Sequence, residues 1–160
     1  MGLFLFQFGA NTEITSFDEL ELFTKLTVIS SNAFDSCTNL KDIKLPPNIT
    51  FLQRRAFYNC TSMAVELDLS NVNRIDDDVF QKSGIVKITI NTNTGTGLCS
   101  GCENLKRLNI GPNFTKISYD RISVIKQHFR KIQQPVVAAY YQKIHPFTSL
   151  AILFFCTASG

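Results

Sequence analysis

Apolar residues recur along the chain at a fixed spacing. Phe34, Phe57 and Phe80 follow one another at a constant interval of 23 positions. The unit that begins at Phe34 has further apolar or small residues at Cys37, Leu40, Ile43, Leu45, Ile49, Leu52 and Ala56. The unit before it aligns at the same offsets through Ile14, Phe17, Leu20, Leu22, Leu26, Ile29 and Ala33. One unit of this length cannot bury its own apolar side chains, so the spacing predicts a stack of similar turns.

A longer segment of the chain is also repeated. "CTNLKDIKLPPNIT" (residues 37–50) returns as "CENLKRLNIGPNFT" (residues 102–115), with seven of fourteen positions identical. Between the two copies, Leu67 and Leu69 are shifted by one position relative to the template. The unit after Phe80 is shorter than the others and ends at Cys99, which stands where a Phe is expected. These departures leave the repeat recognisable throughout.

Each unit contains a short segment in which apolar and polar residues alternate. These segments lie at 19–22, 42–45, 66–69, 86–90 and 107–110. Alternation predicts β-strands, so we expect a short, curved parallel sheet of about five strands. Pro46, Pro47 and Pro112 follow the strands, where proline ends ladder pairing.

The residue types within the unit are more specific than its spacing. The stretch "AFDSCTNLKDIKLPPNITFLQRRAFYNCTSM" (residues 33–63) closely resembles the BspA-like (Treponema-type) leucine-rich repeats, and the resemblance extends over residues 11–118. It implies an α/β-type leucine-rich repeat solenoid with loops and short helices on its convex side. It also implies a non-catalytic binding scaffold, typical of adhesion and surface proteins of bacteria and some parasitic protists, at an extracellular or cell-surface location.

The pattern divides the chain into four parts. Residues 1–10 form an apolar N-terminal cap, and residues 11–120 form the solenoid. Helical spacing of Ile122, Ile125, Phe129 and Ile132 predicts a capping helix over 121–134, ended by Pro135. The apolar tail, 135–160, has no role that its sequence identifies.

Composition limits the classes of partner. A chain of 160 residues with 44% hydrophobic residues can form one sizeable core. Its net charge of +3, without a dense Lys/Arg run, predicts no nucleic-acid partner. The N-terminus lacks the basic region of a clear signal peptide. The longest apolar stretch, from Phe147 to Cys156, is half the length of a bilayer span, so we expect no membrane insertion.

The candidate chemical motifs are weak. Cys37, Cys60 and Cys102 hold one repeat position, so they are interpreted as small buried hydrophobes. Cys99 and Cys102 form C-x-x-C, but no second Cys or His pair stands at zinc-ligand spacing. We therefore predict no metal site.

Two further patterns bear on cofactor binding and catalysis. The glycines of residues 95–101 lead back into a repeat, which favours a flexible loop over a dinucleotide site. His128 and His145 lie outside the repeats, with no nucleophile and acid to complete a catalytic triad. We expect no enzyme activity, no cofactor and no small-molecule substrate.

The side chains that flank the buried strand residues face outward together. The first expected row is Glu19, Asp42, Glu66, Lys87 and Arg107, and the second is Glu21, Lys44, Asp68, Thr89 and Asn109. A solvated sheet face explains these rows as well as a binding surface does. As a functional hypothesis, the concave face binds a protein ligand, such as a host or cell-surface protein. The alternative is a structural fragment that assembles with another chain through its apolar C-terminal tail.

Overall fold

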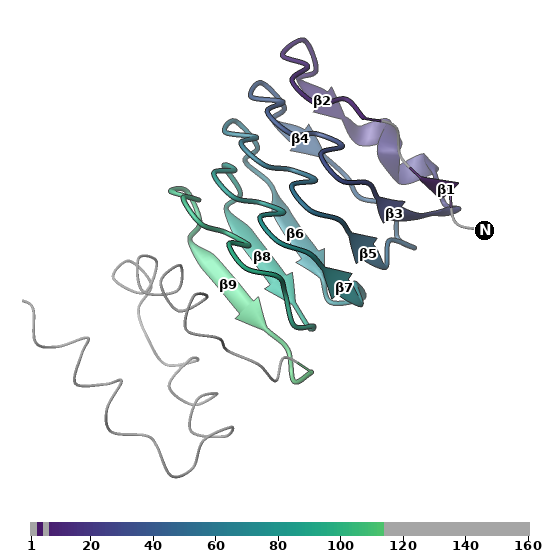
Figure 1. The fold of residues 1–160 in the computed structure, drawn as a ribbon, viewed down its shortest axis with the longest axis vertical. Coiled ribbons are helices and arrows are strands. Elements are labelled where there is room, and N and C mark those ends of the chain that lie inside the picture. The colour runs from purple at the N-terminus through teal and green to yellow at the C-terminus, as the bar shows by residue number, and fades with distance from the viewer. Residues whose placement is uncertain (1–2, 5–6, 114–160) are drawn as a thin grey trace, which may run out of the picture.

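The computed structural model describes residues 3–4 and 7–113 as a parallel β-solenoid of about four turns (Figure 1). The strands are β1 (Leu3–Phe4), β2 (Ser16–Phe17), β3 (Leu26–Ile29), β4 (Asp42–Ile43), β5 (Phe51–Leu52), β6 (Glu66–Leu69), β7 (Arg74–Ile75), β8 (Lys87–Ile90) and β9 (Arg107–Ile110). They form three parallel sheets: β1–β3–β5–β7, β2–β4 and β6–β8–β9. The described residues contain a single helix, the 3-10 helix η1 (Asp18–Leu22).

The spacing that separates the phenylalanines is also the register in which β3, β5 and β7 pair. Val28 pairs with Phe51 and Phe51 with Arg74, so each partner lies one repeat period along the chain. Backbone bonds outside the strands keep the same step, as where the Thr50 N–H donates to the Thr27 carbonyl oxygen at 2.9 Å. The predicted stack of similar turns is therefore confirmed.

The expected strand at 19–22 is wrong, because these residues form η1. Phe17, not Leu20, pairs with Ile43, so the two partners are farther apart in sequence than one repeat period. Three extra residues therefore lie between β2 and β3, and the 3-10 turn accommodates them. Leu20 is buried, whereas Leu22 is 72% exposed, so the two leucines do not share an inward face as strand alternation required.

The one-position shift at Leu67 and Leu69 separates two of the sheets. The Ala64 N–H still donates to the Lys41 carbonyl oxygen, one repeat period earlier, at 3.1 Å. The extra residue that follows Ala64 puts β6 out of step with β4, and β6 pairs only with β8. The strands of this side thus form a pair and a triplet, and the expected continuous sheet of five is not formed.

A column of stacked phenylalanines runs through the core. The rings of Phe34 and Phe57 lie 5.2 Å apart, and those of Phe57 and Phe80 lie 5.4 Å apart, both pairs nearly parallel. Phe8 extends the column, with its ring stacked on Phe34 at 5.4 Å. Phe34, Phe57 and Phe80 are fully buried, so this column forms the centre of the solenoid.

The repeated cysteines lie beside this column. Cys37, Cys60, Cys99 and Cys102 are buried thiols. The thiols donate to carbonyl oxygens of the preceding turn: Cys37 to Phe8 at 3.2 Å, Cys60 to Phe34 at 3.0 Å and Cys102 to Phe80 at 2.8 Å. Burial raises the pKa of the Cys60 thiol, as expected for an inert core residue.

The glycine-rich segment after β8 is a turn of the solenoid and not a free loop. The N–H groups of Asp78, Phe80 and Lys82 donate to the carbonyl oxygens of Thr96, Leu98 and Ser100 at 2.8, 3.0 and 2.7 Å. This turn has four residues fewer than the turns before it, and Thr94 makes only one isolated bridge to Ile75 where earlier turns have a strand. The predicted capping helix at 121–134 and the tail at 135–160 lie outside the described residues.

Candidate functional site

The outward side chains of β6, β8 and β9 lie in two aligned rows. Glu66 pairs with Lys87 and Lys87 with Arg107, while Asp68, Thr89 and Asn109 pair in the same way. The intervening residues Leu67, Leu69, Ile88 and Ile90 are buried, so alternation assigns the two faces as the sequence predicts. Both rows therefore lie on one face of this sheet.

Several contacts order these rows. Lys87 Nζ lies 2.9 Å from Glu66 Oε2, and Asn109 Nδ2 donates to Thr89 Oγ1 at 3.2 Å. The Ser70 N–H donates to Asp68 Oδ1 at 3.0 Å. The hydrogen bond from Lys87 lowers the pKa of Glu66, and hydrogen bonds from Ser70 lower the pKa of Asp68. Both carboxylates are held in their charged form.

The N-terminal part of the expected rows is arranged differently. Asp42 pairs with Ser16, so Glu19 is not its neighbour in the sheet. Glu19 and Glu21 belong to η1 instead, which corrects their predicted placement on a strand. Glu21 still approaches Lys44, since its Oε1 lies 3.7 Å from Lys44 Nζ between exposed side chains.

We use the term polar face for the outward side chains of β4, β6, β8 and β9, together with Lys44, which comes directly after β4. It consists of Asp42, Lys44, Glu66, Asp68, Lys87, Thr89, Arg107 and Asn109, all exposed or half-buried. The acidic and basic parts of the expected first row meet at the Glu66–Lys87 ion pair. This pair leaves Asp42 at one side and Arg107 at the other as exposed charges of opposite sign.

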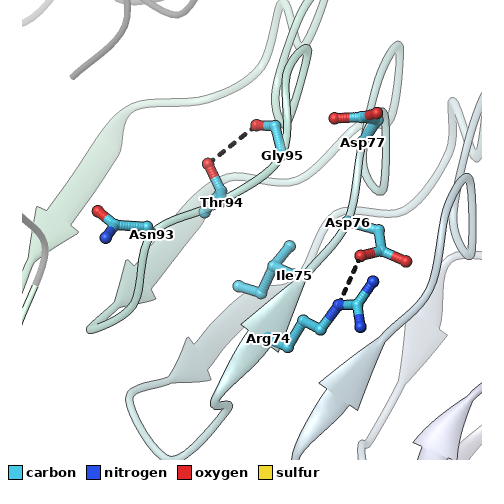
Figure 2. Close-up of a pocket in the computed structure, with 7 residues that line it drawn as sticks. All are labelled: Arg74, Ile75, Asp76, Asp77, Asn93, Thr94 and Gly95. Carbon is cyan, nitrogen blue, oxygen red and sulfur yellow. Dashed lines mark hydrogen bonds and ion pairs between the residues drawn. The ribbon is translucent and has the colours of Figure 1, made fainter. Parts of the chain in front are cut away.

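The shortened turn creates a depression that was not predicted from the sequence. Residues 74–77 and 93–95 line an open hollow of about 400 Å³ beside β7, drawn in Figure 2. Here Arg74 Nε lies 2.9 Å from Asp76 Oδ1, and the Arg74 guanidinium stacks on the Phe51 ring at 4.4 Å. Asp77 Oδ1 accepts the N–H and Oγ1–H of Thr96 at 2.6 and 3.0 Å. Asp77 thus holds the shortened turn through Thr96, whereas Arg74 is paired with Asp76. The short repeat unit was the signal for the hollow in the sequence.

The family model for the BspA type leucine rich repeat region matches residues 9–124, with six copies of the repeat. The chain belongs to this family. BspA-type leucine-rich repeats generally mediate protein–protein interaction or adhesion, and their solenoid is typically a non-catalytic scaffold. Members of the family are commonly surface or extracellular proteins. No curated protein and no solved structure matches the chain significantly.

The described part of the chain holds neither a metal cluster nor a membrane helix. Within residues 3–4 and 7–113, no group of three or more His, Cys, Asp or Glu side chains is arranged to hold a metal ion. The same residues contain no helix long and apolar enough to cross a bilayer.

Proposed function

We propose that this protein is a non-catalytic recognition or adhesion module that binds a protein ligand through its polar face. The observation that carries the proposal is the register of β6, β8 and β9, which aligns polar side chains of both signs in two rows. Membership of the BspA-type family supports a binding function of this kind. An extracellular or cell-surface location belongs to the same proposal.

Rigid strands favour binding by this surface. Side chains on a paired sheet lose little backbone freedom when a ligand docks, so less of the interaction energy is offset by ordering. The Glu66–Lys87 ion pair and the Asn109–Thr89 hydrogen bond further restrict four of the side chains before any contact. The polar face therefore presents a pre-organised pattern.

The charges define the complementary surface of a ligand. Arg107 offers an exposed cation at the β9 side, and Asp42 and Asp68 offer exposed carboxylates. A protein ligand would match them with an acidic group near Arg107 and basic groups near the two aspartates. Complementary charges of this type raise the association rate and exclude wrong partners.

The test is a double charge reversal, Asp42→Lys with Arg107→Glu, which leaves the net charge unchanged. The control is Glu13→Lys with Lys25→Glu, because these two residues are exposed and lie outside the polar face. Each variant is immobilised and exposed to surface proteins from the source cells and from contacting cells, at two salt concentrations. A thermal melt of each variant verifies folding.

We expect the control and the wild type to retain the same ligand and the polar-face variant to lose it. Retention should weaken when the salt concentration rises above about 0.1 M, where the screening length is about 10 Å. Equal retention by both variants would exclude the polar face. Loss of the ligand on deletion of residues 135–160, with the polar-face variant still binding, would favour the alternative of assembly through the apolar tail.

A further inference from the structure

Cys99 and Cys102 are the first and fourth residues of a tight turn. The Cys102 N–H donates to the Cys99 carbonyl oxygen at 3.1 Å, and Gly101 between them has a φ of 72°. Residues 34–37 and 80–83 build the same turn, with the corresponding N–H···O bonds at 3.2 and 3.0 Å. The residue before the fourth position again has positive φ, 61° at Ser36 and 59° at Lys82.

What differs in the turn of residues 99–102 is the side chain at its first position. Phe34 and Phe80 occupy this position in the earlier turns, and their rings belong to the buried aromatic column. Cys99 takes the place of the ring while the fourth residue remains the repeated cysteine. The substitution thus places two thiols in one turn, and both residues are buried, Cys99 at 3% exposure and Cys102 at 0%.

The turn has the dimensions that a disulfide needs. The first and fourth Cα atoms of a β-turn lie within about 7 Å, and disulfides join Cα atoms about 4.4–6.8 Å apart. The two thiols already interact, because a hydrogen bond joins them. We propose that Cys99 and Cys102 form an oxidation site, a dithiol that a small disulfide oxidant such as glutathione disulfide converts to an intramolecular disulfide.

The groups around the pair act on the two thiols in opposite directions. The hydrogen bond from Cys99 and those from Ser83 lower the pKa of Cys102, whereas the hydrogen bond to Cys102 and burial raise the pKa of Cys99. Both sulfurs are buried, so the exchange takes place when this turn opens locally. One thiolate of the pair then attacks one sulfur of glutathione disulfide and releases one glutathione thiolate, which takes up a proton. The other cysteine loses its proton and displaces the second glutathione from the first cysteine's sulfur. The protein loses two hydrogen atoms and the oxidant gains them.

The remaining buried cysteines provide an internal comparison. Ser83 occupies the turn between Cys60 and Cys102, and its Oγ lies 3.5 Å from Cys102 Sγ. Cys60 and Cys102 are thus two turns apart, a separation of about 10 Å that no disulfide spans. Cys37 and Cys60 belong to successive turns, and each thiol donates to a separate backbone carbonyl. Burial raises the pKa of both, so we expect them to stay reduced.

The experiment uses the folded full chain with Cys156→Ser, which removes the thiol that lies outside the described residues. The protein is equilibrated in a series of reduced and oxidised glutathione mixtures, quenched with acid, alkylated under denaturing conditions and digested with trypsin. Cleavage after Lys87 and Lys106 places both cysteines in one peptide, 88–106. Cys37 and Cys60 fall in separate peptides, 26–41 and 56–74.

We expect peptide 88–106 to lose both alkylation sites as the oxidant increases and to become lighter by two hydrogen atoms. Peptides 26–41 and 56–74 should remain alkylated under the same conditions. In a second variant that also carries Cys99→Ser, peptide 88–106 should retain an alkylated or glutathione-modified Cys102. Any of three results would overturn the proposal. The first is full alkylation of peptide 88–106 across the series when both of its cysteines are present, and the second is a stable glutathione adduct on that peptide. The third is a cross-link between the other two peptides instead.

Discussion

Lys87 Nζ lies 2.9 Å from Glu66 Oε2, across the pairing of β8 with β6. This ion pair joins the acidic and the basic parts of the polar face. Both residues stand on strands whose register is fixed by buried leucines and isoleucines on the opposite side. The core thus determines which charges meet at the surface.

The first prediction concerns the titration of Glu66. The hydrogen bond from Lys87 lowers the pKa of this carboxyl group, so the carboxylate stabilises the folded state above the ordinary glutamate pKa. That contribution is lost as the pH falls through the lowered pKa. Lys87→Met should raise the Glu66 midpoint, measured by NMR of its side-chain carboxyl carbon. The midpoint of Asp68 should move much less, because Ser70 supplies its hydrogen bonds.

The second prediction tests the assignment of the two faces of β8. Ile88→Asp introduces a carboxylate at a fully buried position, where the charge can be neither hydrated nor paired. We expect this variant to lose its cooperative thermal unfolding transition, since adjoining turns have no independent core. The neighbouring substitution Thr89→Asp places the same group on the polar face and should retain the transition. Equal melts for the two variants would contradict the strand assignment.

The third prediction concerns the aromatic column. Phe57 lies between Phe34 and Phe80 and is fully buried, so Phe57→Ala should lower the free energy of unfolding by about 3–5 kcal/mol. Phe51→Ala is the matched control, because this ring is only half-buried and covers the Arg74 guanidinium. Denaturant unfolding should give a clearly smaller loss for the control. A loss of equal size would mean that stacking in the column has no special weight.

The fourth prediction concerns the shortened turn. A Cβ at Gly95 would collide with the backbone of Asp76 and Asp77, which cannot move without breaking the bonds from Thr96. Gly95→Ala should therefore lower the free energy of unfolding by about 1–3 kcal/mol, as overpacking does. In Gly9→Ala the nearest atom, the Asn32 carbonyl oxygen, lies 3.2 Å from the new Cβ, so its cost should be smaller. Chemical denaturation of both variants measures the difference.

Much of the solenoid was predictable from the spacing of apolar residues. The turns that contain Phe34, Phe57 and Phe80 follow the repeat, and the strands at 66–69, 87–90 and 107–110 lie in the segments that alternation indicated. A strict repeat is informative because one local pattern is stabilised in the same way by each neighbouring turn.

The structure differs from expectation where the repeat is irregular. Residues 19–22 alternate as a strand does, yet Phe17 packs against the column, with its ring 6.0 Å from that of Phe34, and takes the strand position. Alternation cannot reveal which of two apolar residues pairs with Ile43 of β4. The same limitation hid the hollow beside β7, because residues 74–77 and 93–95 meet only once the turns are stacked.

The order of residues alone specifies the family, the length of a turn and most of the side chains that form the core between residues 26 and 105. It also indicates that Leu67 and Leu69 are out of step with the template. The stacking of the turns establishes that this shift separates β4 from β6, that η1 absorbs three residues, and that Cys99 and Cys102 share one turn. A periodic pattern specifies which side chains are buried, whereas insertions and deletions are accommodated by contacts between neighbouring turns, which the order of residues does not contain.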